Sequence, residues 1–465
     1  MNPSRKPRIG LLGIMQELYD HTFPEITNIQ ETYARKVVAE LSSHLEVTFP
    51  GAARNREDVE RYVRMFNQEQ YDGIMIVMLT YGPGLRTVRA FRENNLPVLL
   101  ANIQPEPVVG KDWNMSHLTF NQGVHGAQDT AHALGRNEVP FSVVTDDFRS
   151  ESFKTYVTDW SRAAMAVQDM KQLRVAIWGQ MPGMADILHD PVDFMKTMGP
   201  QVDHVSLGEI HRLMESVTEL DIEQAMQEDR QNFDIDPKLS RQSHAYACRL
   251  QVAIERFLTT QGYGAWSIYF DEIGLDGRFK QIHMLAASNL MAKGYGYAAE
   301  GDINQASLMA AGFRIAPNAH FTEMYAMDFE RNSSLQSHMG EGNWKIARSD
   351  RKPRLIDRPL GIGGLDNPPT VLFQAQPGPA TIASMVTLKN NRYRLITSQG
   401  EILDTEEMPQ LEMPYFHYRP HNGVRTCLDN WLKNGGPHHQ VMHLGDTRRR
   451  WKIFAELLGM EYVEV

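Results

Sequence analysis

Apolar and polar residues alternate in blocks along the first part of the chain, and the blocks favour strands and helices in turn. Short apolar runs, typical of buried strands, cover residues 8–14, 45–49, 71–79 and 97–102. Apolar residues at helical spacing lie between these runs, at residues 28–44, 56–69 and 85–94. The alternation predicts an N-terminal domain, residues 1–170, that is a doubly wound α/β sheet.

The same alternation restarts after residue 171, where the run Leu-Arg-Val-Ala-Ile-Trp predicts another buried strand. It continues with an expected helix over 243–260, a strand over 265–270 and a helix over 281–294. We therefore expect a central doubly wound α/β domain over residues 171–318.

From residue 319 onwards the pattern changes to short strand-like segments. Segments 371–373, 381–387 and 393–397 alternate as hairpin strands do, and Lys-Asn-Asn at 389–391 provides a turn. The Gly-rich segment 361–364 lacks the strand and helix that flank a phosphate-binding loop, so a turn is expected there. These features predict a β-rich, barrel-like C-terminal domain over residues 319–465.

Composition narrows the class of protein. A chain of 465 residues is too long for one hydrophobic core, and its 42% hydrophobic and 22% charged residues are ordinary for a globular protein. The formal net charge of −10 argues against nucleic acid as a partner. Cys248 and Cys427 lack the spacing of a thiolate metal site or a disulfide framework. Neither a signal peptide nor a run of about 18 apolar residues is found, so we expect a cytoplasmic protein without a membrane span.

Four residues in the second half are candidate ligands of a hard metal ion: Glu300, Glu323, His338 and His439. Two carboxylates and two imidazoles suit a divalent cation such as Mn²⁺ and leave positions open for substrate oxygens. Each residue alone has a plainer interpretation, such as an acid at a helix N-terminus for Glu300 or a structural histidine for His338. The neighbouring His438 is an alternative ligand. Sequence spacing cannot join residues so far apart.

Motifs around these residues resemble the L-arabinose isomerase family over nearly the whole chain. The resemblance is strongest from Gly-Tyr-Gly-Tyr-Ala-Ala-Glu-Gly-Asp at 294–302 to His439, and it includes segments 360–368 and 378–384. In the first half, Gln16 stands in a Gln-x-Leu-Tyr element, and residues 121–126 read Asn-Gln-Gly-Val-His-Gly.

The resemblance implies an enzyme that interconverts an aldose and its 2-ketose through a metal-stabilised enediol. It also implies one Mn²⁺ held by Glu300, Glu323, His338 and His439, with the two glutamates as acid and base. Further pocket residues are implied with it, the first three from a neighbouring subunit of a hexamer: Gln16, Gln122, His125, Met184, Phe270 and Tyr325. A hydride shift between C1 and C2 is the competing mechanism.

The chain departs from the family pattern near the substrate. It has Ile-Asn-Gln at 303–305 instead of Trp-Lys-Thr, Met324 instead of an aspartate, and Gln440 instead of a threonine. These differences make the metal site a firmer expectation than L-arabinose as the substrate. The alternatives are an isomerase or epimerase of another sugar, nearer to the L-fucose isomerases, and a non-catalytic sugar-binding protein on the same fold.

Overall fold

A computed structural model describes residues 5–361 and 364–465, so two residues of the expected turn at 361–364 lie outside the described part. The chain divides into two compact units, one ending at Gln168 and the other beginning at Asp169. Within the described ranges, no helix combines the length and apolar character needed to cross a membrane.

The first unit is built on a parallel sheet with strand order β2-β1-β4-β5-β6, in which β3 also pairs with β1. Its strands are β1 (Arg8–Ile14), β2 (Glu46–Thr48), β3 (Ala52–Ala53), β4 (Gly73–Met78), β5 (Val98–Asn102) and β6 (Ser142–Thr145). Every residue of β4 is buried, as its uninterrupted apolar run predicts.

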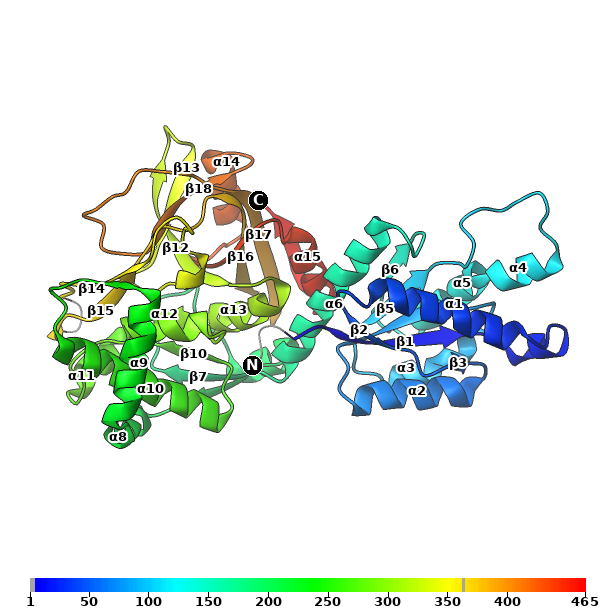
Figure 1. The fold of residues 1–465 in the computed structure, drawn as a ribbon, viewed down its shortest axis with the longest axis horizontal. Coiled ribbons are helices and arrows are strands. Elements are labelled where there is room, and N and C mark those ends of the chain that lie inside the picture. Colours follow the sequence, from blue (N-terminus) through cyan, green and yellow to red (C-terminus); the bar gives the residue numbers. More distant parts are fainter. Residues whose placement is uncertain (1–4, 362–363) are drawn as a thin grey trace. The chain divides into compact units, whose positions relative to one another are not determined.

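Helices cover both faces of this sheet, with α1 on one side and α2 and α3 on the other (Figure 1). They are η1 (Glu17–His21), α1 (Ile26–Leu41), α2 (Arg56–Gln68), η2 (Gly84–Thr87), α3 (Val88–Arg92), α4 (Met115–Asn121) and α5 (Gly123–Arg136). Helix α6 (Glu151–Lys171) leads into the second unit. The prediction of a doubly wound N-terminal domain is confirmed.

The second unit begins with a smaller parallel sheet of strand order β11-β10-β7-β8. Its strands are β7 (Arg174–Trp178), β8 (Gln201–His204), β10 (Ala265–Ile268) and β11 (Gly296–Ala299). The helices are α7 (Pro191–Met198), α8 (Leu207–Ser216), α9 (Glu219–Asn232), α10 (Arg241–Gln261), α11 (Phe270–Asp276), α12 (Met284–Ala292) and α13 (Ile303–Ile315). The expected strand over 265–270 is too long, because β10 ends at Ile268 and Phe270 opens α11.

The C-terminal part is a closed β-barrel. Each of the strands β16, β19, β12, β13, β18 and β17 pairs with the next, and β17 pairs back with β16. Their bounds are β12 (His320–Asp328), β13 (Ser333–Ser337), β16 (Gly378–Leu388), β17 (Arg392–Ile402), β18 (Tyr415–Pro420) and β19 (His439–Leu444). Closure leaves no free edge among these six strands, and it confirms the β-rich, barrel-like prediction.

Smaller elements complete the second unit. Strand β20 (Glu461–Glu464) adds to β17 in parallel, and β9 (Asp234–Ile235), β14 (Arg354–Asp357) and β15 (Pro369–Leu372) form a three-stranded sheet. The remaining helices are η3 (Trp344–Ile346), α14 (Val424–Lys433) and α15 (Arg448–Leu457).

Helix α13 joins the central sheet to the barrel. All of its residues are buried, because it contacts strands β7, β10 and β11 and also β16 and β19. Figure 1 shows it lying between the central sheet and the barrel. This packing carries the turn between β11 and α13 to the barrel wall, where the candidate ligands lie.

Candidate metal centre and active site

Two of the four candidate metal ligands lie on barrel strands, and the other two directly follow the ends of strands. Glu300 follows β11 at the carboxyl end of the central sheet, the edge at which parallel sheets place their ligands. Glu323 on β12 lies directly opposite His439 on β19 in the antiparallel register, and opposite Ser337 on β13. His338 comes immediately after Ser337. Barrel pairing therefore gathers three residues that are far apart in sequence.

The side chains converge to distances suited to a bound cation. One potential ligand atom each from Glu300, His338 and His439 lies within 4.8 Å of the other two, and the same holds for Glu323, His438 and His439. The Glu300 Oε2 atom is 3.6 Å from His439 Nε2 and 3.3 Å from His438 Nε2. The structure thus brings all four predicted ligands, and His438, into one cluster.

Both predicted histidine ligands have one ring nitrogen held by a carboxylate. His439 Nδ1 lies 3.0 Å from Asp302 Oδ2, and His338 Nδ1 lies 2.7 Å from Glu341 Oε2. When Nδ1–H donates to a carboxylate, Nε2 is left as the lone-pair nitrogen, which is the usual arrangement around metal-bound histidines. His439 Nε2 is buried and has no hydrogen-bond partner among the described residues. A cation at the cluster would satisfy this orphaned nitrogen, so the donor set fits a divalent metal.

A fully buried aromatic ring packs against both imidazoles. The Phe321 ring centroid lies 4.8 Å from the His338 ring and 4.8 Å from the His439 ring. Tyr297 packs on Phe321 at 5.5 Å, and its hydroxyl donates to Glu341 at 2.8 Å. An apolar floor of this kind strengthens electrostatic interactions within the cluster because it keeps water away from them.

Burial and neighbouring charges shift the pKa values of the two histidine ligand candidates in opposite directions. Burial would lower the pKa of His338, but the adjacent Glu341 carboxylate outweighs it and raises the pKa to about 9. Burial, together with the cationic neighbours His438 and His338, lowers the pKa of His439 to about 3. Burial opposes ionisation of Glu300, yet hydrogen bonding from His438 and the histidine charges hold its pKa below the usual value. His439 is therefore neutral and ready to coordinate, whereas His338 must lose a proton first.

A large cavity adjoins this cluster. It has a volume of about 770 Å³, and its walls include His438, Asp186, Met324, Tyr325 and Trp431. Tyr325 is 40% exposed. Burial and the carboxylate of Glu323 raise the pKa of the Tyr325 phenol far above its usual value. The cavity places a neutral phenol and apolar surface beside the candidate ligands.

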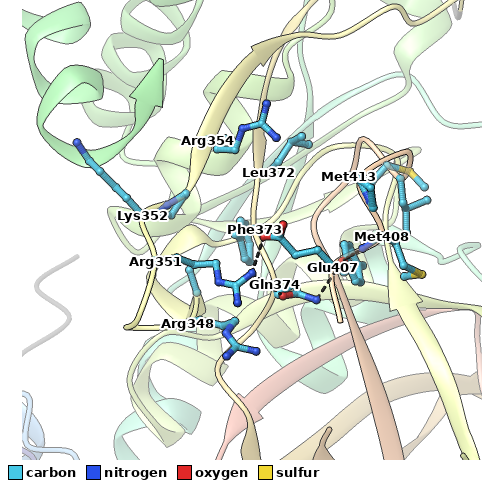
Figure 2. Close-up of a pocket in the computed structure, with 15 residues that line it drawn as sticks. Arg348, Arg351, Lys352, Arg354, Leu372, Phe373, Gln374, Glu407, Met408 and Met413 are labelled. Atoms are coloured by element: carbon cyan, nitrogen blue, oxygen red, sulfur yellow. Dashed lines mark hydrogen bonds and ion pairs between the residues drawn. The ribbon is translucent and has the colours of Figure 1, made fainter. Parts of the chain in front are cut away.

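A second pocket, shown in Figure 2, is lined by several arginine and lysine side chains. Arg351 pairs with Glu407 at 2.5 Å, and Arg348 pairs with Asp350 at 2.7 Å and Asp404 at 2.5 Å. These guanidinium groups are neutralised by the protein itself. The pocket holds none of the metal-ligand clusters found in the described residues.

Asp229, His244 and Cys248 form another cluster of potential ligands, all buried. Its groups already bond to each other and to the neighbouring helix α12. Asp229 accepts from His244 at 2.7 Å, from Cys248 at 3.5 Å and from Asn289 at 2.9 Å. Burial raises the pKa of the Cys248 thiol, so the thiolate is not available. The cluster is a hydrogen-bond network between α9, α10 and α12.

Known protein families match nearly the whole chain. Three family models match consecutive parts of the chain: the L-arabinose isomerase N-terminal domain over residues 6–172, the central domain over 174–318 and the C-terminal domain over 318–461. The chain belongs to the L-arabinose isomerase family.

Two relatives illustrate the distance within this family. The L-arabinose isomerase of Clostridium beijerinckii is 27% identical over 476 residues, covering 97% of this chain and 96% of the relative. That of Aeromonas salmonicida is 29% identical over 414 residues, covering 86% and 82%. A solute-binding protein of an ABC transporter from Actinobacillus succinogenes matches with 13% identity, coverages of 59% and 84%, and a TM-score of 0.18, too low to support an argument.

The predicted pocket residues fall in both units. Met184 lies in the loop after β7, Phe270 begins α11 and Tyr325 lies on β12, all in the second unit. In the first unit, Gln16 precedes η1 directly after β1, Gln122 lies between α4 and α5, and His125 is on α5. Their assignment to one substrate pocket stays a prediction.

Two residues that depart from the family pattern, Asn304 and Gln305, pack between α13 and the barrel. Gln305 donates to the Met385 carbonyl at 2.8 Å and accepts from the Met385 amide at 3.2 Å. Asn304 donates to Thr387 Oγ1 at 3.4 Å. Both side chains are fully buried between α13 and β16. Both side chains therefore hydrogen-bond to the barrel wall through strand β16. Met324, by contrast, lines the large cavity.

Three carboxylates that hold histidines were missed in the sequence. Asp302 and Glu341 hold His439 and His338, and Asp186 holds His438 with Oδ2 2.6 Å from the ring Nδ1. A local signal existed for two of them, since Asp302 is two residues after Glu300 and Glu341 is three after His338. Asp186 lies in the loop after β7, and nothing in the sequence links it to His438.

Proposed function

We propose that this chain is a metal-dependent aldose–ketose isomerase of the L-arabinose isomerase type. The observation that supports it best is the convergence of Glu300, Glu323, His338 and His439, whose Nε2 atom has no hydrogen-bond partner among the described residues, within a chain matched by the three family models. L-arabinose is the first candidate substrate because the relatives carry its name.

In this proposal Glu300, Glu323, His338 and His439 hold one Mn²⁺ ion. The ion would act as a Lewis acid towards the oxygens on C1 and C2 of the sugar, where negative charge develops. The pKa of His439 at about 3 keeps its imidazole neutral for this task. The apolar floor under the cluster, formed by Phe321, excludes water from the developing charge.

The two glutamates carry the proton transfer. Isomerisation removes a proton from one of the two carbons, C1 or C2, and delivers one to the other, while a second proton moves between the two oxygens. A pair of carboxylates can act as base and acid for these steps. His438 lies 3.3 Å from Glu300 Oε2 and 3.9 Å from Glu323 Oε2 through its Nε2 atom, so it contacts both carboxylates.

We also propose the division into domains 1–170, 171–318 and 319–465 and a homo-oligomer, a hexamer by resemblance. In it Gln16, Gln122 and His125 of a neighbouring subunit would complete the sugar pocket. The three matched family models support the domain division.

A sugar panel tests the reaction. Purified protein with Mn²⁺ is incubated with pentoses, hexoses and deoxysugars, and ketose formation is measured, with a Glu300→Gln variant as the control. Ketose from L-arabinose supports the proposal in full. If ketose forms only from a sugar other than L-arabinose, the reaction type is supported but the substrate is a different sugar. This is the outcome predicted by the L-fucose isomerase-like alternative. If the protein binds metal and sugar but forms ketose from no sugar of the panel, the proposed reaction is wrong and a sugar-binding protein is favoured.

A further inference from the structure

The loop after β7, residues 179–187, lies against the turn that carries Glu300. The Met181 amide donates to the Glu300 carbonyl at 2.8 Å, and Gln180 Nε2 donates to the Gly301 carbonyl at 3.3 Å. Gln180 also donates to the Ile187 carbonyl at 3.1 Å, and the Ile187 side chain is fully buried. The loop is therefore anchored at both ends without any contribution from the Asp186 side chain.

From this anchored loop, Asp186 reaches His438, which is 252 residues later in the chain. A single oxygen, Oδ2, accepts from the His438 backbone amide at 3.1 Å and from the ring Nδ1 at 2.6 Å. Two bonds to one atom fix both the backbone of His438 and the rotation of its ring. The opposite ring nitrogen, Nε2, is then directed at Glu300 and Glu323.

We propose that Asp186 is a positioning residue for the reaction, acting through His438 on the two carboxylates. This inference rests on the function proposed above. Asp186 is 36% exposed, and an exposed ion pair contributes little to stability. Other hydrogen bonds, from Met181 and Gln180, already hold the loop in place. A role in holding the loop therefore does not explain the two bonds from Asp186 to His438. What Asp186 supplies is the orientation of one imidazole, and misplacement of a group by about 1 Å can cost about 100-fold in rate.

Kinetics of Asp186→Ala and Asp186→Asn test the proposal, with Asp190→Ala as a matched control. Asp190 is a nearby exposed acid that caps α7 and does not bond to His438. We expect kcat to fall about 10- to 100-fold in Asp186→Ala, with KM and the Mn²⁺ affinity of the metal-free protein changing less than about threefold. Asp186→Asn keeps an acceptor oxygen and should recover part of the loss. A loss in Asp190→Ala equal to that in Asp186→Ala would overturn the proposal.

A double-mutant cycle asks whether Asp186 acts through His438. If it does, Asp186→Ala should change kcat less than about twofold in a His438→Gln background. If the losses in kcat of the two single variants multiply in the double variant, a positioning role through His438 is contradicted. His438→Gln alone must lower kcat, since otherwise no orientation of its ring could matter.

An NMR measurement on the metal-free protein separates this inference from the proposed reaction. A ring Nδ1–H that donates to a carboxylate gives a downfield proton resonance, which His438→Gln identifies by its loss. The resonance should disappear in Asp186→Ala and persist in Asp190→Ala. Its persistence in Asp186→Ala would overturn the inference. If the wild-type protein shows no turnover, the proposed reaction is wrong. The NMR measurement still decides whether the Asp186 carboxylate holds the His438 ring.

Discussion

At the scale of single residues, His439 Nε2 is a buried ring nitrogen that lies 3.6 Å from Glu300 Oε2 and has no hydrogen-bond partner among the described residues. We expect His439→Gln to weaken Mn²⁺ binding by at least about tenfold, because one ligand is lost. Calorimetric titration of the metal-free protein measures this. His443→Gln is the matched control, since His443 is buried on the same strand but donates to the Gly312 carbonyl. Equal losses in the two variants would remove His439 from the ligand set.

The pKa of His338 makes metal binding depend on pH. Burial lowers this pKa, but the Glu341 carboxylate raises it to about 9, so below pH 9 an incoming cation must displace a proton. Apparent affinity should therefore rise with pH, by up to about tenfold per unit from this group, and level off near pH 9. Glu341→Gln removes the charge that raises the pKa, so its plateau should begin at lower pH. Titrations between pH 6 and 9.5 in both proteins give the comparison, and identical curves would contradict it.

Sequence reasoning at this scale singled out residues whose type suits metal binding, and their role as ligands stays a prediction. The four ligand candidates stood in motifs that could be recognised, and the structure gathers them. The carboxylates Asp302, Glu341 and Asp186 act by touching a histidine, and an aspartate or glutamate that does so looks like any other acid in the sequence. Their role depends on distances that only the folded chain sets.

At the scale of elements, the buried network around Asp229 connects three helices. Asp229→Ala would leave His244 and Asn289 without their carboxylate partner in a dry site, so we expect a loss of about 3 kcal/mol in the free energy of unfolding. Glu228→Ala, at the exposed neighbouring position of α9, should cost less than about 0.5 kcal/mol. Urea unfolding followed by circular dichroism measures both. A mild Asp229→Ala would mean that other groups or water replace the carboxylate.

Strands and helices with a strong pattern were predictable, and their ends were less so. The first strand, Arg8–Ile14, was predicted with the observed bounds, because its apolar run follows the basic, proline-containing segment 5–8. The strand predicted over 265–270 stops at Ile268, since a helix beginning at Phe270 is as apolar as the strand before it. Periodicity does not mark a boundary between two buried elements.

At the scale of the whole molecule, the barrel could be expected as a β-rich region but its closure could not be derived. Closure depends on pairings such as β16 with β19, which join segments separated by two other strands and a helix. The same pairings place Glu323 opposite His439. Three of the four candidate ligands are therefore brought together by pairing between barrel strands that are distant in sequence, and no local pattern reveals these pairings.

The proposed oligomer leads to a complementation experiment. A Glu300→Gln subunit has an altered metal site, and a His125→Ala subunit lacks a group that we assign to its neighbour's pocket. Each variant alone should be inactive or nearly so, and mixed oligomers should recover part of the activity, because some pockets then combine two intact halves. Mass spectrometry must show that subunits exchange. Exchange without recovery would mean that each pocket belongs to a single chain.

Glu300 has a backbone φ of +66°, a conformation that costs a residue with a side chain about 1 kcal/mol or more and costs glycine almost nothing. Selection for stability alone would therefore favour glycine at this position, in a turn that already contains Gly301. Glu300→Gly should unfold at a higher temperature than the wild type while losing metal binding. The glutamate at position 300 therefore carries a cost in stability, which the proposed metal site would explain.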